Sequence, residues 1–96
     1  MPYSLETTKR YDREFARAKR RGLDENDMFD VVGKLINGEK LPPKNHDHPL
    51  KGEYKGTREC HVHPDWLLIY EKDDCIRLIR LLRTGTHSDL YGKRRG

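Results

Sequence analysis

The sequence predicts a small α+β domain in which two N-terminal helices pack on one face of a small, mainly antiparallel sheet. Two segments in the first half carry apolar residues at helical spacings of three and four. A proline-containing connection follows them, and the second half contains three strand-like runs joined by short turns. The 96 residues correspond to one domain over 1–96, with a short basic tail at 93–96.

The N-terminal segment predicts a strand followed by a helix. Residues 3–8 favour a short strand, and residues 9–21 favour a helix because Tyr11, Phe15 and Ala18 recur at spacings of four and three. This apolar stripe lies on an otherwise basic segment, so the helix is expected to bury one side and expose the other.

A second helix is expected over 24–37. Gly22 can end the first helix, and Asp24 can cap the second with its side-chain oxygen. Pro42 and Pro43 then predict an irregular connection, because proline lacks the N–H donor of regular structure. The buried stripe of the second helix is predicted to consist of Met28, Val31, Val32, Leu35 and Ile36.

The remaining chain predicts an antiparallel meander. Strands are expected over 58–63, 66–72 and 76–84, with a tight turn at Asp73 and Asp74. The last of these strands is apolar on both sides, which is typical of a strand in the interior of a sheet.

Composition favours a protein with an anionic partner. The net charge is +4 at pH 7, only 33% of residues are apolar and 38% are charged. No apolar run is long enough to span a membrane and no signal peptide is visible, so the expected location is the cytoplasm. Cys60 and Cys75 lack a C-x-x-C spacing and are expected to be reduced packing residues.

Histidines are the main candidates for chemistry, because imidazole exchanges protons near neutral pH. Strand alternation puts Glu59, His61 and His63 on one face of the 58–63 strand, and we expect both imidazoles to face the side without helices. Gly85 permits a close or unusual backbone path that would bring His87 over the same face. All five histidines lie in the second half of the chain, at His46, His48, His61, His63 and His87.

Several ordered motifs resemble the YafQ-type toxins of the RelE/ParE superfamily, which are bacterial ribosome-dependent mRNA endonucleases. These motifs are Asp47-His48-Pro49-Leu50, Tyr54-Lys55-Gly56, His61-Val62, Pro64-Asp65-Trp66 and Arg83-Thr84-Gly85-Thr86-His87. The resemblance implies a RelE-like, microbial ribonuclease-type fold and the toxin component of a type II toxin-antitoxin system. It also implies RNA cleavage by attack of a ribose 2′-hydroxyl on the adjacent phosphate, a reaction that requires no metal and no cofactor.

The same resemblance implies the residues of the active site. The matching catalytic positions are His48, His61, Asp65 and His87, with an aromatic ring at Tyr91. His87 is the expected general acid, Asp65 or His61 the expected base, and His48 stabilises the phosphate or shares in proton transfer. The acid and base roles can be exchanged at this stage.

Contacts to RNA are expected from aromatic and basic side chains. Trp66 and Tyr91 offer ring faces for stacking on a base, although Trp66 fits a core position equally well. Lys51, Lys55 and Arg83 are candidates for phosphate contact, and Arg83 is the preferred clamp because it adjoins the motif that ends at His87.

The resemblance further implies three partners: a cognate antitoxin protein, the ribosome with mRNA in its decoding site, and operator DNA reached through the antitoxin.

Two alternative functions stay open. The basic charge and aromatic residues also suit a non-enzymatic nucleic-acid-binding module. The pairs His46-x-His48 and His61-x-His63 also suit a metal hydrolase, since such a spacing on a strand directs both rings to one face.

Overall fold

Five strands form one mixed sheet, and three helices pack on it in a computed structural model that describes residues 2–92. The predicted basic tail at 93–96 lies outside the described residues. In chain order the elements are β1 (Ser4–Thr7), α1 (Lys9–Arg20), α2 (Glu25–Ile36), the 3-10 turn η1 (Pro43–Asn45), β2 (His48–Pro49), the 3-10 turn η2 (Gly52–Tyr54), β3 (Arg58–His63), β4 (Trp66–Asp73), β5 (Leu78–Gly85) and α3 (His87–Tyr91).

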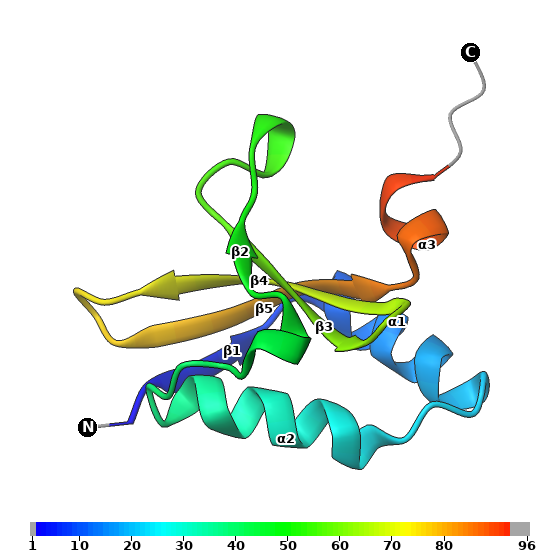
Figure 1. Ribbon diagram of the computed structural model, residues 1–96, viewed down its shortest axis with the longest axis horizontal. Helices are drawn as coiled ribbons and strands as arrows, with labels where there is room; N and C mark the ends of the chain where they lie inside the picture. The colour runs from blue at the N-terminus through cyan, green and yellow to red at the C-terminus, as the bar shows by residue number, and fades with distance from the viewer. Residues whose placement is uncertain (1, 93–96) are drawn as a thin grey trace.

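The sheet has the strand order β1-β5-β4-β3-β2 (Figure 1). Strand β1 runs parallel to β5, and the other neighbouring pairs are antiparallel, which confirms the mainly antiparallel sheet. The position of β5 between β1 and β4 confirms that the strand with two apolar sides is internal.

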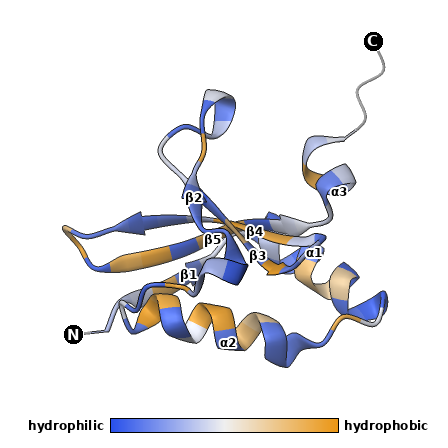
Figure 2. Ribbon diagram, in the orientation of Figure 1, coloured by the Kyte–Doolittle hydropathy of each residue, from blue (hydrophilic) through white to orange (hydrophobic). Residues whose placement is uncertain are grey.

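Helices α1 and α2 cover one face of the sheet, as the sequence predicted (Figure 1). The Thr8 side chain accepts a hydrogen bond from the Tyr11 backbone at the start of α1, and Asp24 caps α2 in the same way. Apolar residues lie along α2 and the neighbouring strands (Figure 2). Within 2–92 no helix has the length and apolar character to cross a membrane.

The opposite face of the sheet is only partly covered. Helix α3 and the segment around β2 and η2 rise on this side, away from α1 and α2 (Figure 1). They enclose a small apolar cluster in which Leu67, Ile69 and Leu90 are buried. We call this side of the sheet the open face.

Two elements, β2 and α3, were not expected from the sequence. Helix α3 begins with a capping box, in which the Thr86 hydroxyl accepts from the Asp89 backbone and the Asp89 carboxylate accepts from the Thr86 backbone. Strand β5 begins two residues later than predicted, because Asp73 Oδ1 accepts hydrogen bonds from the backbones of Cys75 and Ile76 and extends the turn.

Candidate active site

His87 is the first residue of α3, and Asp65 holds it in place from the turn between β3 and β4. Asp65 Oδ1 lies 2.9 Å from the His87 backbone nitrogen and 2.6 Å from its ring Nδ1. The hydrogen bonds from the His87 backbone and ring lower the pKa of Asp65 below its ordinary 3.8, so this carboxylate is ionised at neutral pH. A carboxylate can only accept hydrogen bonds, which assigns the ring proton to Nδ1. The Nε2 atom of His87 has no hydrogen-bond partner among residues 2–92.

His61 stands next to His87 on the open face. The centroids of these two rings are 5.7 Å apart, and the ring of His46 lies 5.0 Å from His61 on its other side. Burial lowers the pKa of His61 below its ordinary 6.5, and the neighbouring imidazoles act in the same direction against the opposing effect of Glu59. His61 is therefore neutral at pH 7 and able to accept a proton.

Glu59 is a buried carboxylate beneath this group of rings. Its side chain is only 6% exposed, and it accepts a hydrogen bond from the Tyr91 hydroxyl. Glu59 Oε1 lies 3.4 Å from His48 Nε2 and 4.0 Å from His61 Nε2. Glu59 was not expected as a site residue from the sequence, although strand alternation puts it on the same face as His61. That shared face was the signal that could have identified it.

His48 reaches the site because β2 pairs with β3 in a register that sets it opposite Glu59. Its Nδ1 lies 2.6 Å from the backbone oxygen of His46, so Nδ1 carries a proton. Asp47 anchors this loop on the sheet, since its Oδ1 accepts hydrogen bonds from the Tyr70 hydroxyl at 2.8 Å and from Arg58 Nε at 3.2 Å.

Tyr91 and Lys51 line an open cavity of about 410 Å³ together with Tyr54 and Arg83. Tyr91 is 42% exposed, and its ring meets the ring of Tyr54 edge to face at 6.4 Å. Burial and the bond to Glu59 raise the pKa of Tyr91, so its hydroxyl stays protonated. Lys55, at the end of η2, is exposed. The side chains of Tyr91, Lys51 and Lys55 are exposed to solvent, and their contact with RNA stays a prediction.

Two residues expected to contact RNA are instead parts of the protein interior. Trp66 is 1% exposed and donates from Nε1 to Thr84 Oγ1, so its core alternative holds and its ring cannot stack on a base. Arg83 lines the same cavity as Tyr91 but is only 8% exposed, and its guanidinium is bound to Glu14 and the Tyr54 hydroxyl, so its role as a phosphate clamp stays a prediction that this ion pair disfavours. The acidic partner comes from α1, far away in the sequence.

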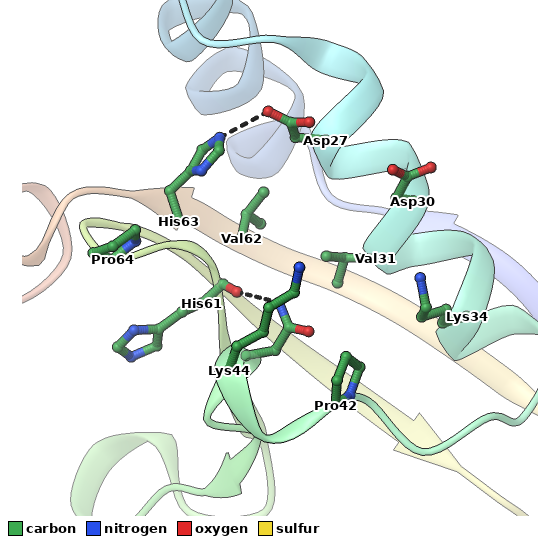
Figure 3. A pocket seen from close by; sticks show the side chains of 11 residues that line it. Asp27, Asp30, Val31, Lys34, Pro42, Lys44, His61, Val62, His63 and Pro64 are labelled. Atoms are coloured by element: carbon green, nitrogen blue, oxygen red, sulfur yellow. Dashed lines mark hydrogen bonds and ion pairs between the residues drawn. The ribbon is translucent and has the colours of Figure 1, made fainter.

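The prediction that His63 shares the open face with His61 is also wrong. A β-bulge between His61 and His63 turns His63 towards the helices, where its ring stacks on Trp66 and its Nε2 lies 2.8 Å from Asp27 Oδ2 of α2. His61 and His63 point apart at the rim of a second cavity of about 410 Å³ (Figure 3). The bulge therefore prevents His61 and His63 from directing their rings to one face, as the predicted metal site requires.

The donor set does not fit a metal ion either. Within residues 2–92, no group of three or more histidine, cysteine, aspartate or glutamate side chains is arranged to hold one. His48 and His87 each direct Nδ1 to a protein oxygen, and Nε2 of His48 faces the Glu59 carboxylate.

Comparisons with known proteins agree with this fold. The family described as "Bacterial toxin of type II toxin-antitoxin system, YafQ" matches residues 3–92. The mRNA interferase toxin YafQ of Escherichia coli (strain K12) is 42% identical over 89 residues, which cover 92% of this chain and 95% of that protein.

Solved structures give the same result. In the crystal structure of the E. coli DinJ-YafQ toxin-antitoxin complex, the similar chain has a TM-score of 0.87 and 40% identity, with coverage of 96% of this chain and 100% of that one. A metal-bound toxin from Helicobacter pylori has a TM-score of 0.86 and 40% identity, with coverage of 94% and 99%. This chain therefore belongs to the YafQ family of bacterial toxins of type II toxin-antitoxin systems.

Proposed function

We propose that this toxin is an endoribonuclease that inhibits translation by cutting mRNA on the ribosome. The observation that carries the proposal is the gathering of His48, His61 and His87 with Asp65 on the open face of the sheet. The E. coli relative, which is 42% identical, is named an mRNA interferase, and this supports the same activity here.

The proposed reaction is an internal transesterification of RNA. The ribose 2′-hydroxyl loses its proton to a base and its oxygen bonds to the adjacent phosphorus, while the bond from phosphorus to the 5′-oxygen breaks. An acid then protonates that 5′-oxygen, and the products are a 2′,3′-cyclic phosphate and a 5′-hydroxyl. The step requires a base, an acid and a cation near the phosphate, all of which histidine can supply.

The geometry favours His61 as the base and His87 as the acid. His61 is neutral at pH 7 because burial lowers its pKa. Asp65 is a poor base, because its pKa is lowered and its Oδ1 already accepts two hydrogen bonds from His87. We assign Asp65 to the orientation of His87: its carboxylate binds the Nδ1 proton and stabilises the positively charged ring, from which Nε2 donates its proton to the leaving oxygen. This is how an aspartate fixes the tautomer of a catalytic histidine in other enzymes.

His48 is suited to stabilise the phosphate. Its Nδ1 donates to the His46 carbonyl, its Nε2 lies 3.4 Å from Glu59 Oε1, and the side chain is 45% exposed and so accessible to a phosphate. Glu59 also receives the Tyr91 hydroxyl and so fixes the relation between β3 and α3. We assign Glu59 to positioning, because it is too buried to reach the RNA.

The RNA strand is proposed to lie over the open face between α3 and η2. Tyr91 offers an exposed ring on which a base can stack, an interaction worth about 1 to 3 kcal/mol. Lys51 and Lys55 are exposed and can contact phosphates. A small protein with this limited contact area would depend on the ribosome to present the mRNA in its decoding site.

The proposed partners follow from the family. A cognate antitoxin would inhibit the toxin in the cytoplasm, as the toxin-antitoxin complex of the E. coli relative suggests. An acidic segment that orders on binding would suit a protein with a net charge of +4. Operator DNA would be reached through the antitoxin.

A binding module without catalysis is the second candidate, since basic charge and exposed aromatic rings serve simple binding equally well. Grouped imidazoles add less to such binding than lysines would, whereas acid-base cleavage requires them. The metal hydrolase has less support, because the bulge separates His61 from His63.

The deciding experiment maps cleavage of one mRNA by primer extension, with and without translating ribosomes. Wild type and His87→Ala are compared at equal concentration. Discrete cuts that require both ribosomes and wild-type protein support the proposal. Equal cutting of naked RNA would make the protein a free ribonuclease, and the absence of cuts in every sample would favour the binding module.

A further inference from the structure

Helix α3 is too short to be stable without anchors. It contains five residues, His87–Tyr91, and a helix of this length is unstable in water unless tertiary contacts hold it. Two residues of the proposed active site, His87 and Tyr91, nevertheless depend on its position. Asp65, in the turn between β3 and β4, holds His87, and Glu59 of β3 holds Tyr91. The side of α3 that faces α1 requires an anchor of its own.

Asp89 makes that anchor with the end of α1. Arg21, the C-cap residue of α1, donates from Nη1 to Asp89 Oδ2 at 2.7 Å and from Nη2 to Asp89 Oδ1 at 3.2 Å. Arg17 Nη2 lies 3.7 Å from the same Oδ1. The fork of a guanidinium on a carboxylate fixes orientation as well as distance.

Asp89 is also the acidic member of the capping box at the start of α3. Its Oδ2 accepts the Thr86 backbone N–H at 2.9 Å while it binds Arg21. The side chain is 16% exposed, and the hydrogen bond from Arg21 is the largest cause that lowers the pKa of this carboxyl far below its ordinary value. Asp89 therefore stays ionised at any pH at which the protein would act.

Gly85 provides the space for this arrangement. A Cβ atom at Gly85 would lie 2.8 Å from Asp89 Cβ and 2.9 Å from Asp89 Oδ2, closer than real contacts allow. The backbone of Gly85 is ordinary strand, so the absence of a side chain matters here for close approach and not for unusual torsion angles.

We propose that Asp89 and Arg21 form a clamp between α3 and α1 that positions His87 for proton transfer. Residues 87 and 89 are two apart on a helix of 3.6 residues per turn, so their side chains leave α3 on nearly opposite sides. Asp65 holds one side of the helix and Arg21 holds the other. In its effect on rate, the clamp rests on the proposed ribonuclease function.

The first test compares Arg21→Ala with Arg20→Ala. Arg20 is an exposed neighbour on α1 with no ion pair among residues 2–92, so both variants lose one positive charge and any attraction to the ribosome falls equally. We expect Arg21→Ala to lower kcat about 10- to 100-fold with KM unchanged, because a displaced catalytic group slows the chemical step. Arg20→Ala should keep the wild-type kcat, and Arg21→Lys should recover part of the loss. Equal kcat values for Arg21→Ala and Arg20→Ala would overturn the proposal.

A double-mutant cycle identifies the partner. Asp89→Asn retains an oxygen that can accept the Thr86 backbone N–H but loses the charge that binds Arg21. If the clamp acts as one unit, Arg21→Ala in the Asp89→Asn background should lower kcat by less than about two-fold further. Independent, multiplying losses would contradict it.

A second readout does not require activity. The Nδ1 proton of His87, held by Asp65, should give a slowly exchanging resonance in the NMR spectrum of the free protein. We expect Arg21→Ala to broaden or shift this resonance while the amide signals of α1 and the sheet stay in place, and Arg20→Ala to leave it unchanged. An unchanged resonance in Arg21→Ala would overturn the clamp. Failure of the wild type to cut RNA would reject the proposed function, and the NMR result would still decide the clamp.

Discussion

The two faces of the sheet hold polar side chains in different ways. On the face covered by α1 and α2, Trp66 and Thr84 are buried and hydrogen-bonded to each other. On the open face, His61 and His87 stand next to each other without a hydrogen bond between them, and each keeps part of its ring exposed. Polar groups on the first face are satisfied within the protein, whereas those on the second are left available to a substrate.

His61 and His63 make the same comparison within one strand. They are two residues apart on β3, yet the bulge sends His63 to Asp27 and Trp66 on the covered face. Only His61 lies beside the other imidazoles of the open face. The residue type therefore indicates which chemistry is possible, and the local backbone determines whether the side chain reaches the open face.

Removal of an imidazole from the open face should have the largest effect. We expect His87→Ala to lower the cleavage rate about 10²- to 10⁴-fold, since one positioned proton-transfer group contributes that much. His63→Ala is the matched control and should keep the wild-type rate. The check is single-turnover cleavage of ribosome-bound mRNA. A His63→Ala variant as slow as His87→Ala would abolish the distinction between the faces.

Truncation on the covered face should affect stability instead. Trp66→Ala is expected to cost about 3 to 5 kcal/mol of unfolding free energy, because it empties a buried site and leaves Thr84 without its donor. His63→Ala, which removes a solvent-exposed hydrogen bond to Asp27, should cost no more than about 1 kcal/mol. Urea unfolding followed by circular dichroism measures both. A Trp66→Ala protein of wild-type stability would show that the ring is not a core anchor.

Tyr91 lies between these extremes, because its hydroxyl is bound inside and its ring is exposed. Tyr91→Ala should weaken RNA binding by about 1 to 3 kcal/mol through lost stacking. Tyr91→Phe keeps the ring, loses the bond to Glu59 and should cost only about 1 kcal/mol. KM on programmed ribosomes reports the difference. Equal losses in the two variants would argue that the hydroxyl matters and the ring does not.

The pH dependence should reveal the base on the open face. The pKa of His61 is lowered from 6.5, so its neutral form is lost only when the pH falls below that value. The rate should therefore rise with pH through a pKa below 6.5, and His61→Ala should remove this acidic limb. The measurement is single-turnover rate across mildly acidic to neutral pH. An acidic limb that persists unchanged in His61→Ala would assign the base elsewhere.

Chelation should have the smallest effect. The described residues 2–92 hold no cluster of metal ligands. We therefore expect that protein treated with EDTA, and then freed of it, cleaves mRNA at the wild-type rate on ribosomes kept in magnesium. Rate loss that only zinc or copper restores would revive the metal hydrolase.

Much of the fold could be predicted from the sequence, because the spacing of apolar residues and capping residues such as Asp24 indicate α1 and α2. Strand β3 was predicted with its true bounds. The bulge at His63 could not be predicted, since it depends on how β4 pairs with β3. The start of α3 could have been predicted, because Thr86 and Asp89 have the three-residue spacing of a capping box.

The site was predicted in part for a similar reason. Motif residues such as His48, Asp65 and His87 do gather on the open face. The ion pair of Arg83 could not be predicted, because its partner Glu14 is distant in sequence and no local pattern reveals such a pair. Long-range ion pairs and bulges depend on tertiary packing, and the spacing of residues in the sequence does not predict that packing.

The most direct test of the account is the chemistry of the RNA ends in a single-turnover reaction on ribosomes. Wild-type protein is predicted to leave a 2′,3′-cyclic phosphate and a 5′-hydroxyl, and His87→Ala is predicted to make the same ends at a rate lower by about 10²-fold or more. A 3′-hydroxyl with a 5′-phosphate, or an undiminished rate in His87→Ala, would contradict acid-base cleavage by the imidazoles of the open face.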